Sequence, residues 1–292
     1  MAVTTTYAFE QFNLAVTPSE ATKEKINQRK NAVEATLRAA FPSGSDIQFQ
    51  SSKIIGSLGR NTAGNPVSDI DLMVHLHVDT DLWNRRYRQN SADFLYRVRS
   101  SLNSTSTVQK IGARGQAVRL FYQDGLYVDV APVEKYTSGA YGIPDGSGGW
   151  LTTDPVKHET FLNEKNATLS GDLKRVIRFA KQWNSAHGSR IGSFHLEMLV
   201  ARTYGTLTTD SRDALRLFFS HNRNNLSVID PAGHSGDLSS SLTWSARADI
   251  NNSLATALNR ADLAIQAERR GDHREAIRLW GIILGSRFPI YG

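Results

Sequence analysis

The first half of the chain alternates between helical and strand-like spacing of its apolar residues. Thr17-Pro18-Ser19-Glu20 predicts a helix start, because threonine can cap, proline suits the first turn and Glu20 completes a capping box. This helix is expected to run to about Ala40, with apolar residues at helical intervals at Ile26, Val33, Leu37 and Phe41. Residues 47–55 then alternate, which predicts a strand leading into Gly56-Ser57.

A second strand is expected to begin at Asp69-Ile70-Asp71 and to continue to about Leu76. Side chains two residues apart on a strand point to the same face. Asp69 and Asp71 are therefore predicted to lie side by side, while the opposite face of the strand is apolar: Ile70, Leu72, Val74 and Leu76.

The next segment combines an arginine-rich amphipathic pattern with a hairpin signal. Residues 82–102 predict a helix. Val118–Tyr122 and Leu126–Val130 predict two strands joined by a turn at Asp124-Gly125. Residues 139–155 are rich in glycine and proline and predict a loop.

Helical spacing dominates after about residue 158. Leu173 to Trp183 predicts one helix and Gly192-Ser193 begins another, whereas residues 206–245 are mixed and polar. Residues 248–283 predict one or two helices, broken near Gly271-Asp272. The pattern thus predicts an α/β (α+β) protein, with a mixed-sheet part at residues 1–158 and a helical part at residues 159–292.

Composition and charge narrow the classes of function. A hydrophobic fraction of 40% supports a sizeable core, and the absence of cysteine excludes disulfides and thiolate zinc sites and fits a cytoplasmic location. The start shows no signal-peptide pattern, and no apolar run approaches the roughly 18 residues of a membrane span. A net charge of +6 favours anionic partners such as nucleotides or nucleic acid, although it also describes an ordinary basic surface.

The two adjacent carboxylates carry the first chemical inference. Asp69 and Asp71 repel each other unless a cation lies between them, and Mg²⁺ prefers oxygen ligands, commonly carboxylates together with substrate phosphates. Asp129 lies on the polar face of a later apolar strand and becomes a third carboxylate if that strand pairs with the first. Two metal ions could then activate a hydroxyl and stabilise departing pyrophosphate. A purely structural aspartate at a strand end is the alternative reading of Asp129.

Gly56-Ser57 adds a phosphate-binding signal, because its backbone N–H groups and hydroxyl are not screened by bulky side chains. Gly56, Ser57 and Arg60, followed by Asp69-x-Asp71 and Asp129, resemble the core of polymerase-β-type nucleotidyltransferases. More narrowly, the chain resembles the cGAS/DncV-like nucleotidyltransferases (CD-NTases) of bacterial anti-phage signalling.

The second half resembles the same family. The segment from Val176 to Asn184 is similar to its lysine-tryptophan helix, and Ser193-Phe194-His195-Leu196-Glu197 to its serine-aromatic helix. The resemblance implies that Lys181 and Ser193 contact the donor triphosphate. It also implies a two-lobed fold with a cleft, two Mg²⁺ ions held by Asp69, Asp71 and Asp129, and Mn²⁺ as a substitute.

Two departures from the family pattern qualify this reading. Asn61 stands where members often have glycine after the arginine, and asparagine tolerates left-handed backbone angles. The zinc-binding cysteines of the animal DNA sensor are missing, so no DNA requirement is inferred. Several aromatic residues are candidates for stacking on bases: Tyr122, Tyr127, Tyr136, Tyr141 and Trp150. The run Arg85, Arg86 and Arg88 reads chiefly as a solvated helix face, and His75, His77 and His195 read as structural.

The function expected from the resemblance is condensation of nucleoside triphosphates into a cyclic di- or trinucleotide second messenger. ATP is the expected substrate, with the second base unspecified. The expected partners are a downstream effector that senses the product and a regulatory protein, with no membrane partner. Two other classes stay open at this point: a nucleotidyltransferase acting on RNA or a small molecule, and a non-catalytic nucleotide- or RNA-binding protein.

Overall fold

The computed structural model describes residues 2–208 and 210–292 and divides into two compact units. The sheet unit comprises Ser19–Arg60 and Val67–His158. The helical unit comprises Met1–Pro18, Asn61–Pro66 and Glu159–Gly292. The mixture of a sheet with helices confirms the predicted fold class. In the part of the chain that the structure describes, no helix is long and apolar enough to cross a membrane.

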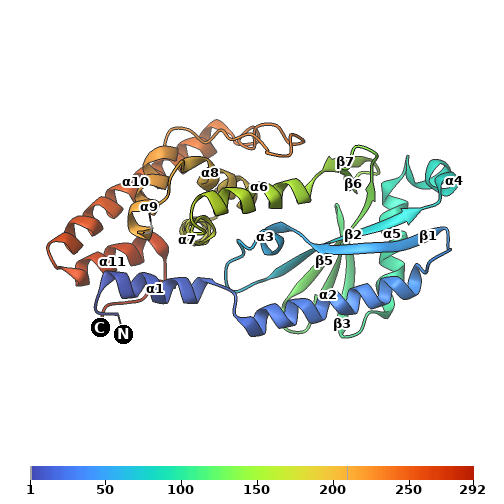
Figure 1. Cartoon of the computed structure of the whole chain (residues 1–292), viewed down its shortest axis with the longest axis horizontal. Coiled ribbons are helices and arrows are strands. Elements are labelled where there is room, and N and C mark those ends of the chain that lie inside the picture. The colour runs from blue at the N-terminus through green and yellow to red at the C-terminus, as the bar shows by residue number, and fades with distance from the viewer. Residues whose placement is uncertain (1, 209) are drawn as a thin grey trace. The chain divides into compact units, whose positions relative to one another are not determined.

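The sheet unit is built on five strands in the order β1-β2-β5-β4-β3, with β6 and β7 added beside β5 (Figure 1). Strands β2 and β5 run parallel, and the other pairs are antiparallel. The strands are β1 (Ile47–Ile54), β2 (Asp69–Val78), β3 (Val108–Arg114), β4 (Ala117–Tyr122), β5 (Tyr127–Lys135), β6 (Tyr141–Pro144) and β7 (Trp150–Thr153).

One face of this sheet carries the core of the unit. The apolar positions of β2 are buried as their alternation predicts, and they pack with those of β4 and β5 under α2 and α5. Figure 1 shows α2 running along the strands. The opposite face is left for the polar positions of the same strands. The helices and helical turns are α2 (Glu20–Ala40), α3 (Gly56–Gly59), α4 (Thr80–Leu82), a π-helix (Trp83–Tyr87), α5 (Ser91–Ser101) and a 3-10 turn (Leu102–Ser104).

Three predictions for the sheet unit are corrected by the structure. Helix α2 begins two residues later than the capping argument placed it, because Ser19, not Thr17, accepts the hydrogen bond from the N–H of Thr22. The helix predicted at 82–102 is interrupted, since the π-turn ends at Tyr87 and Asn90 caps a new helix. The loop predicted at 139–155 contains the β6–β7 hairpin.

Short strands explain that last error. Each strand of the hairpin has four residues, too few for an alternation that stands out among glycines and prolines. The turn is closed by Asp145, whose Oδ1 accepts hydrogen bonds from the N–H groups of Ser147 (2.7 Å) and Gly149 (2.9 Å).

The helical unit packs around aromatic side chains. Phe9 and Phe12 of α1 contact Phe179, Trp280 and Phe288, with ring centroids 4.9 to 6.0 Å apart. The helix α1 was not predicted, and its buried residues belong to this core. The helices are α1 (Thr5–Val16), α6 (Pro155–Thr168, which begins in the sheet unit), α7 (Leu173–Ala186), α8 (Ser193–Thr203), α9 (Ser211–Asn222), α10 (Trp244–Arg269) and α11 (His273–Leu284).

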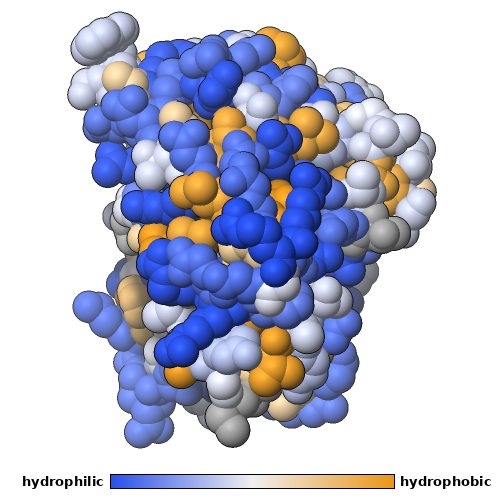
Figure 2. All heavy atoms as spheres, turned by 90° about the vertical axis from the view of Figure 1, so that its left-hand side faces the viewer, coloured by the Kyte–Doolittle hydropathy of each residue, from blue (hydrophilic) through white to orange (hydrophobic). Residues whose placement is uncertain are grey.

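The break between α10 and α11 falls at Gly271-Asp272 as predicted. Figure 2 shows mainly hydrophilic residues on the face that it presents, with smaller groups of apolar residues between them. Scattered apolar side chains of this kind are ordinary for a protein surface.

The helical core generates a stability prediction from two leucines of α9. Leu215 is fully buried, whereas Leu217 is 44% exposed. Leu215→Ala should lower the free energy of unfolding by about 2–5 kcal/mol, because it removes buried methyl groups and leaves a cavity. Urea unfolding followed by circular dichroism measures the change. Leu217→Ala is the matched control, and equal effects of the two substitutions would contradict the packing described here.

Candidate active site

Three aspartates meet on the polar face of the sheet at one end of the parallel strand pair. In the register of β2 and β5, Asp71 lies opposite Asp129, and Asp69 lies opposite Tyr127. The two strands therefore pair, which is the condition under which Asp129 was expected to join Asp69 and Asp71 as a third carboxylate. The side chains of all three acids are half-buried.

The electrostatic consequence of this convergence falls on Asp71. Burial, followed by the nearby charges of Asp69 and Asp129, raises the pKa of Asp71 to about 6, while Arg60 and Arg119 act in the opposite direction. The uncompensated negative charge of the three carboxylates is what a bound cation would neutralise.

Arg119 is a residue of this site that the sequence reasoning missed. Its Nε and Nη2 donate to the two oxygens of Asp129 at 2.7 and 2.5 Å, and its guanidinium lies 3.9 Å from the ring centroid of Tyr127. This hydrogen bonding raises the pKa of Arg119. The predicted hairpin already indicated this pairing. Arg119 and Asp129 are equally far along the chain from Asp124, so they lie opposite each other on the two strands.

Glycine is required at position 56 by the approach of the turn to Asp71. Gly56 begins the single turn of α3 with φ of 64°, and a Cβ atom there would lie 2.0 Å from Oδ2 of Asp71. The N–H of Ile55 also donates to the carbonyl of Asp71 at 2.8 Å. Ser57, half-buried on α3, is thus held beside the acidic strand. Asn61 has φ of 56°, which confirms the expectation that asparagine accommodates the left-handed position.

The donor chemistry of this site fits a hard divalent cation. Three carboxylates on neighbouring positions offer only oxygen ligands, which suits Mg²⁺ or Mn²⁺. Within residues 2–208 and 210–292, however, no three acidic or histidine side chains are oriented as a ready group of metal ligands. Both oxygens of Asp129 accept hydrogen bonds from Arg119.

Lys181 and Ser193 belong to the helical unit. Lys181 Nζ lies 2.6 Å from Oε1 of the fully buried Glu197 and donates to the carbonyl of Thr62 at 3.1 Å. Ser193 is exposed at the first residue of α8, where the helix N-terminus favours anions. Glu197 was part of the quoted motif, but its pairing with Lys181 was not anticipated. His195 is buried with Nε2 2.7 Å from the carbonyl oxygen of Leu226, as expected for a structural histidine.

The segment Asn61–Pro66 is fastened to the helices by several polar contacts. Besides Lys181, Arg178 donates to the carbonyl of Asn61 at 3.2 Å, and Arg287 donates to that of Asn65. The N–H of Asn65 donates to the carbonyl of Val16 at 3.0 Å. The middle of the connection between the Gly56-Ser57 turn and Asp69 is therefore held within the helical unit.

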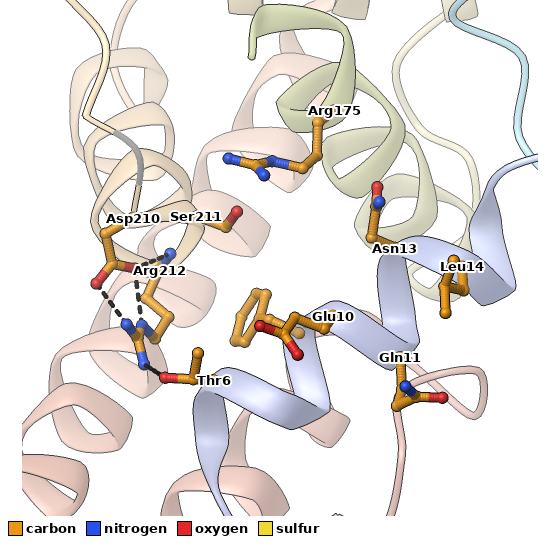
Figure 3. A pocket seen from close by; sticks show the side chains of 10 residues that line it. Thr6, Glu10, Gln11, Asn13, Leu14, Arg175, Asp210, Ser211 and Arg212 are labelled. Carbon is orange, nitrogen blue, oxygen red and sulfur yellow. Dashed lines mark hydrogen bonds and ion pairs between the residues drawn. The ribbon is translucent and has the colours of Figure 1, made fainter.

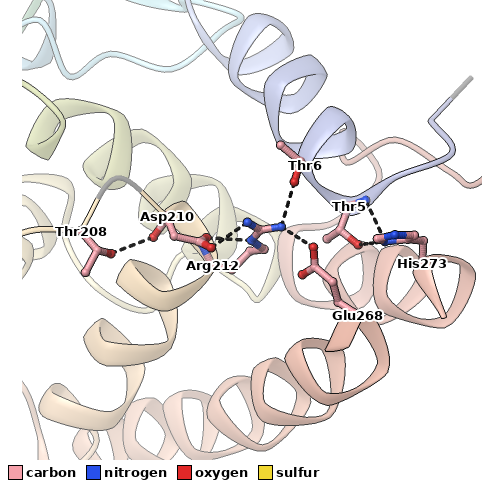
Figure 4. A network of polar contacts seen from close by, with 7 residues as sticks. All are labelled: Thr5, Thr6, Thr208, Asp210, Arg212, Glu268 and His273. Atoms are coloured by element: carbon pink, nitrogen blue, oxygen red, sulfur yellow. Dashed lines mark hydrogen bonds and ion pairs between the residues drawn. The ribbon is translucent and has the colours of Figure 1, made fainter. Parts of the chain in front are cut away.

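The helical unit also holds a pocket of about 410 Å³ beside α1 and the start of α9 (Figure 3). Arg212 at its wall is already occupied: it pairs with Asp210 (2.6 Å) and Glu268 and donates to Thr6 (3.1 Å) (Figure 4). Arg175 pairs with Asp172 at 3.1 Å. Because acids neutralise its arginines, this pocket is a weaker phosphate site than the Gly56-Ser57 turn.

Comparison with known proteins decides the family. A model of the Second Messenger Oligonucleotide or Dinucleotide Synthetase domain matches residues 1–166. A probable cyclic nucleotide synthase of Bacillus cereus is 30% identical over 268 residues, covering 80% of this chain and 81% of that protein. The chain belongs to the cGAS/DncV-like nucleotidyltransferase family.

A second relative and a solved structure of the same fold are also similar to the chain. The cyclic AMP-AMP-AMP synthase of an Acinetobacter species is 27% identical over 252 residues, covering 80% of this chain and 71% of that protein. CdnC of E. coli MS115-1, solved in a complex with HORMA-deltaN, has a TM-score of 0.79 at 19% identity and covers 97% of this chain and 98% of its own. The chain is a nucleotidyltransferase that synthesises cyclic oligonucleotides, and the two alternative classes are not favoured.

The close approach of Gly56 to Asp71 can be tested with two alanine substitutions. Gly56→Ala should reduce synthesis at least about 10-fold, because the added Cβ displaces the Asp71 carboxylate from the turn. Initial rates of product formation, measured beside thermal unfolding, report the effect.

Gly115→Ala is the matched control, since Gly115 has φ of 58° but nothing within 4 Å of an added Cβ. It carries the same backbone strain without the collision. Equal losses of activity in the two variants would assign the effect to strain alone.

The Lys181–Glu197 pair predicts an unusual pattern of stability. Lys181→Met should destabilise the protein by about 3–5 kcal/mol, because it leaves the buried carboxylate of Glu197 without its cation. Adding Glu197→Gln should recover much of this loss. Chemical unfolding of both variants measures the difference. Lys174→Met on the same helix is the control, since Lys174 Nζ donates to the neutral side chain of Asn163 (2.5 Å) and not to a buried carboxylate. A similar cost for both lysines would argue against the pair.

Proposed function

We propose that Asp69, Asp71 and Asp129 form the reaction centre at which this enzyme joins nucleoside triphosphates. The observation that carries this proposal is the parallel register of β2 and β5, which sets Asp71 beside Asp129. A 3′-hydroxyl oxygen of the acceptor attacks the α-phosphorus of the donor, and the bond to pyrophosphate breaks. Repetition on the linear intermediate closes the ring.

The three carboxylates would hold two divalent cations, Mg²⁺ with Mn²⁺ as a substitute. When bound, the cations supply neutralisation of the phosphates and activation of the attacking oxygen. Arg119 orients Asp129 through its two hydrogen bonds, and each carboxylate oxygen of Asp129 keeps a lone pair with which it could hold a cation. Gly56 keeps the turn close to Asp71, so the donor phosphates can lie against backbone N–H groups and the Ser57 hydroxyl.

Lys181 and Ser193 are proposed to bind the donor triphosphate, as the family resemblance implies. Support comes from the exposed start of α8 at Ser193 and from the partial exposure of the Lys181 side chain, 14%. The double variant Lys181→Met/Glu197→Gln distinguishes the structural role of Lys181, its ion pair with Glu197, from its proposed role in phosphate binding. Recovered stability with weakened ATP binding would support a phosphate contact in addition to the structural pair.

The biological setting proposed is anti-phage signalling in the cytoplasm, where nucleoside triphosphates are abundant. ATP is the proposed substrate, which the name of the Acinetobacter relative supports. An effector that senses the product is the proposed downstream partner. A HORMA-type regulatory partner is proposed because CdnC was solved with one. The division into a nucleotidyltransferase core at residues 1–158 and a C-terminal lobe at residues 159–292 stays a prediction.

Incubation with all four nucleoside triphosphates, one α-³²P-labelled at a time, tests the reaction centre. Asp69→Asn and Asp71→Asn should each reduce phosphatase-resistant product about 100-fold or more, because each removes a carboxylate that would hold the cations facing the reacting phosphates. Mass spectrometry of the wild-type product identifies its bases and ring size.

Asp81→Asn is the matched control, because Asp81 is an exposed acid of the same unit outside the reaction centre. Circular dichroism checks that each variant is folded. Full activity of a folded Asp69→Asn or Asp71→Asn variant would refute the assignment.

A further inference from the structure

A second pocket lies at the opposite end of the sheet from the three aspartates. It encloses about 550 Å³ and is lined by Trp83, Arg88, Gln89, Tyr136, Gly148, Gly149 and Trp150. Tyr136 follows the last residue of β5, six residues along the strand from Asp129 to Lys135. At about 3.3 Å per residue this separates the pocket from the acids by roughly 20 Å. The reaction centre therefore does not account for it.

Three aromatic rings form its walls. The rings of Trp83 and Trp150 are 5.0 Å apart at an interplanar angle of 51°, and Tyr136 lines the same pocket. Trp150 is fixed in place, since its Nε1 donates to the carbonyl of Tyr87 at 3.0 Å. Aromatic walls held in this way provide faces on which a planar heteroaromatic ring can stack.

Two glycines, Gly148 and Gly149, contribute backbone to the lining of the pocket. The carbonyl of Gly148 accepts from the N–H of Ser91 at 2.9 Å, and that of Gly149 accepts from the Ser91 hydroxyl at 2.5 Å. Ser91 itself is fully buried at the start of α5. The backbone wall is thus anchored before any ligand arrives, which lowers the ordering cost of binding.

Arg88 gives the pocket its charge. It is exposed on the turn that interrupts the predicted helix, and the one hydrogen bond described for its side chain is a long one, 3.4 Å from Nη1 to Oδ1 of Asn84. The side chain of its neighbour Arg86, by contrast, pairs with Asp93 at 3.3 Å. The Arg88 guanidinium is thus weakly hydrogen-bonded and lines a pocket with three aromatic rings. Such a site suits a ligand in which a flat ring carries an anionic group.

We propose that this pocket binds a planar heteroaromatic compound carrying an anionic group, of the nucleoside monophosphate class. The ring stacks on Trp83, Trp150 and Tyr136, and the anion pairs with Arg88. A volume of about 550 Å³ lies within the range of small-molecule sites. The run of arginines that reads in the sequence as a solvated helix face thereby includes one binding residue.

Fluorine NMR of the full chain labelled with 5-fluorotryptophan tests the proposal, with AMP as the probe. The chain has five tryptophans, and Trp→Phe variants assign their signals. EDTA is present, so that the metal-dependent reaction centre is not loaded. The Trp83 and Trp150 signals should shift with AMP, and they should shift equally in the Asp69→Asn/Asp71→Asn variant. This last result separates the pocket from the proposed catalytic function.

Variants of the exposed arginines test the anion contact. Arg88→Gln should weaken AMP binding about 10-fold, because it removes a charged hydrogen bond, while leaving adenosine binding unchanged. Arg85→Gln, on the same turn but outside the pocket lining, is the matched control. Trp83→Leu should weaken both probes at least about 5-fold through lost stacking.

Three outcomes would overturn the proposal. The Trp83 and Trp150 signals could stay unmoved by both AMP and adenosine at millimolar concentration. Inorganic phosphate alone could reproduce the AMP shifts, which would leave an anion site without ring recognition. Arg88→Gln and Arg85→Gln could weaken AMP equally, which would assign the effect to general surface charge.

Discussion

The organisation of the sheet unit depends on like charges brought together by hydrogen bonding between two parallel strands. Asp71 and Asp129 are register partners, so the backbone ladder, not attraction between side chains, holds their carboxylates near each other. The apolar alternation on the other face of β2 keeps this register, because a slip of one residue would bury the acids and expose the core. The folding energy of the core is thus what maintains an electrostatically unfavourable site.

The surrounding residues limit that cost without removing it. Arg119 neutralises Asp129 from the adjacent strand, and Gly56 lets the backbone turn approach Asp71. The pKa of Asp71 nevertheless remains raised, to about 6. The site is thus only partly neutralised by its own side chains, and the proposed cations would balance the charge that remains.

Much of this arrangement could be predicted from the sequence, because its signals are local. The alternation around Asp69 and Asp71 and the Asp124-Gly125 turn fixed the strands and their faces correctly. Contacts between distant segments could not be read in this way. The pairing of Lys181 with Glu197 and Thr62 joins residues from three segments, and the pocket at Trp83 joins a helical turn to a hairpin that looked like a loop.

The division of the chain into units has a consequence for making hybrids between relatives. Because Asn61–Pro66 and the first helix belong to the helical unit, that unit is discontinuous in the sequence. A fragment that starts at residue 159 would lack Phe9 and Phe12 from its core and Thr62 from the Lys181 contact. A hybrid of two relatives made with a single crossover would therefore combine segments from different parents within one folding unit. Exchange of the helical unit between relatives requires the transfer of three separate stretches at once, so these three stretches are expected to diverge in concert.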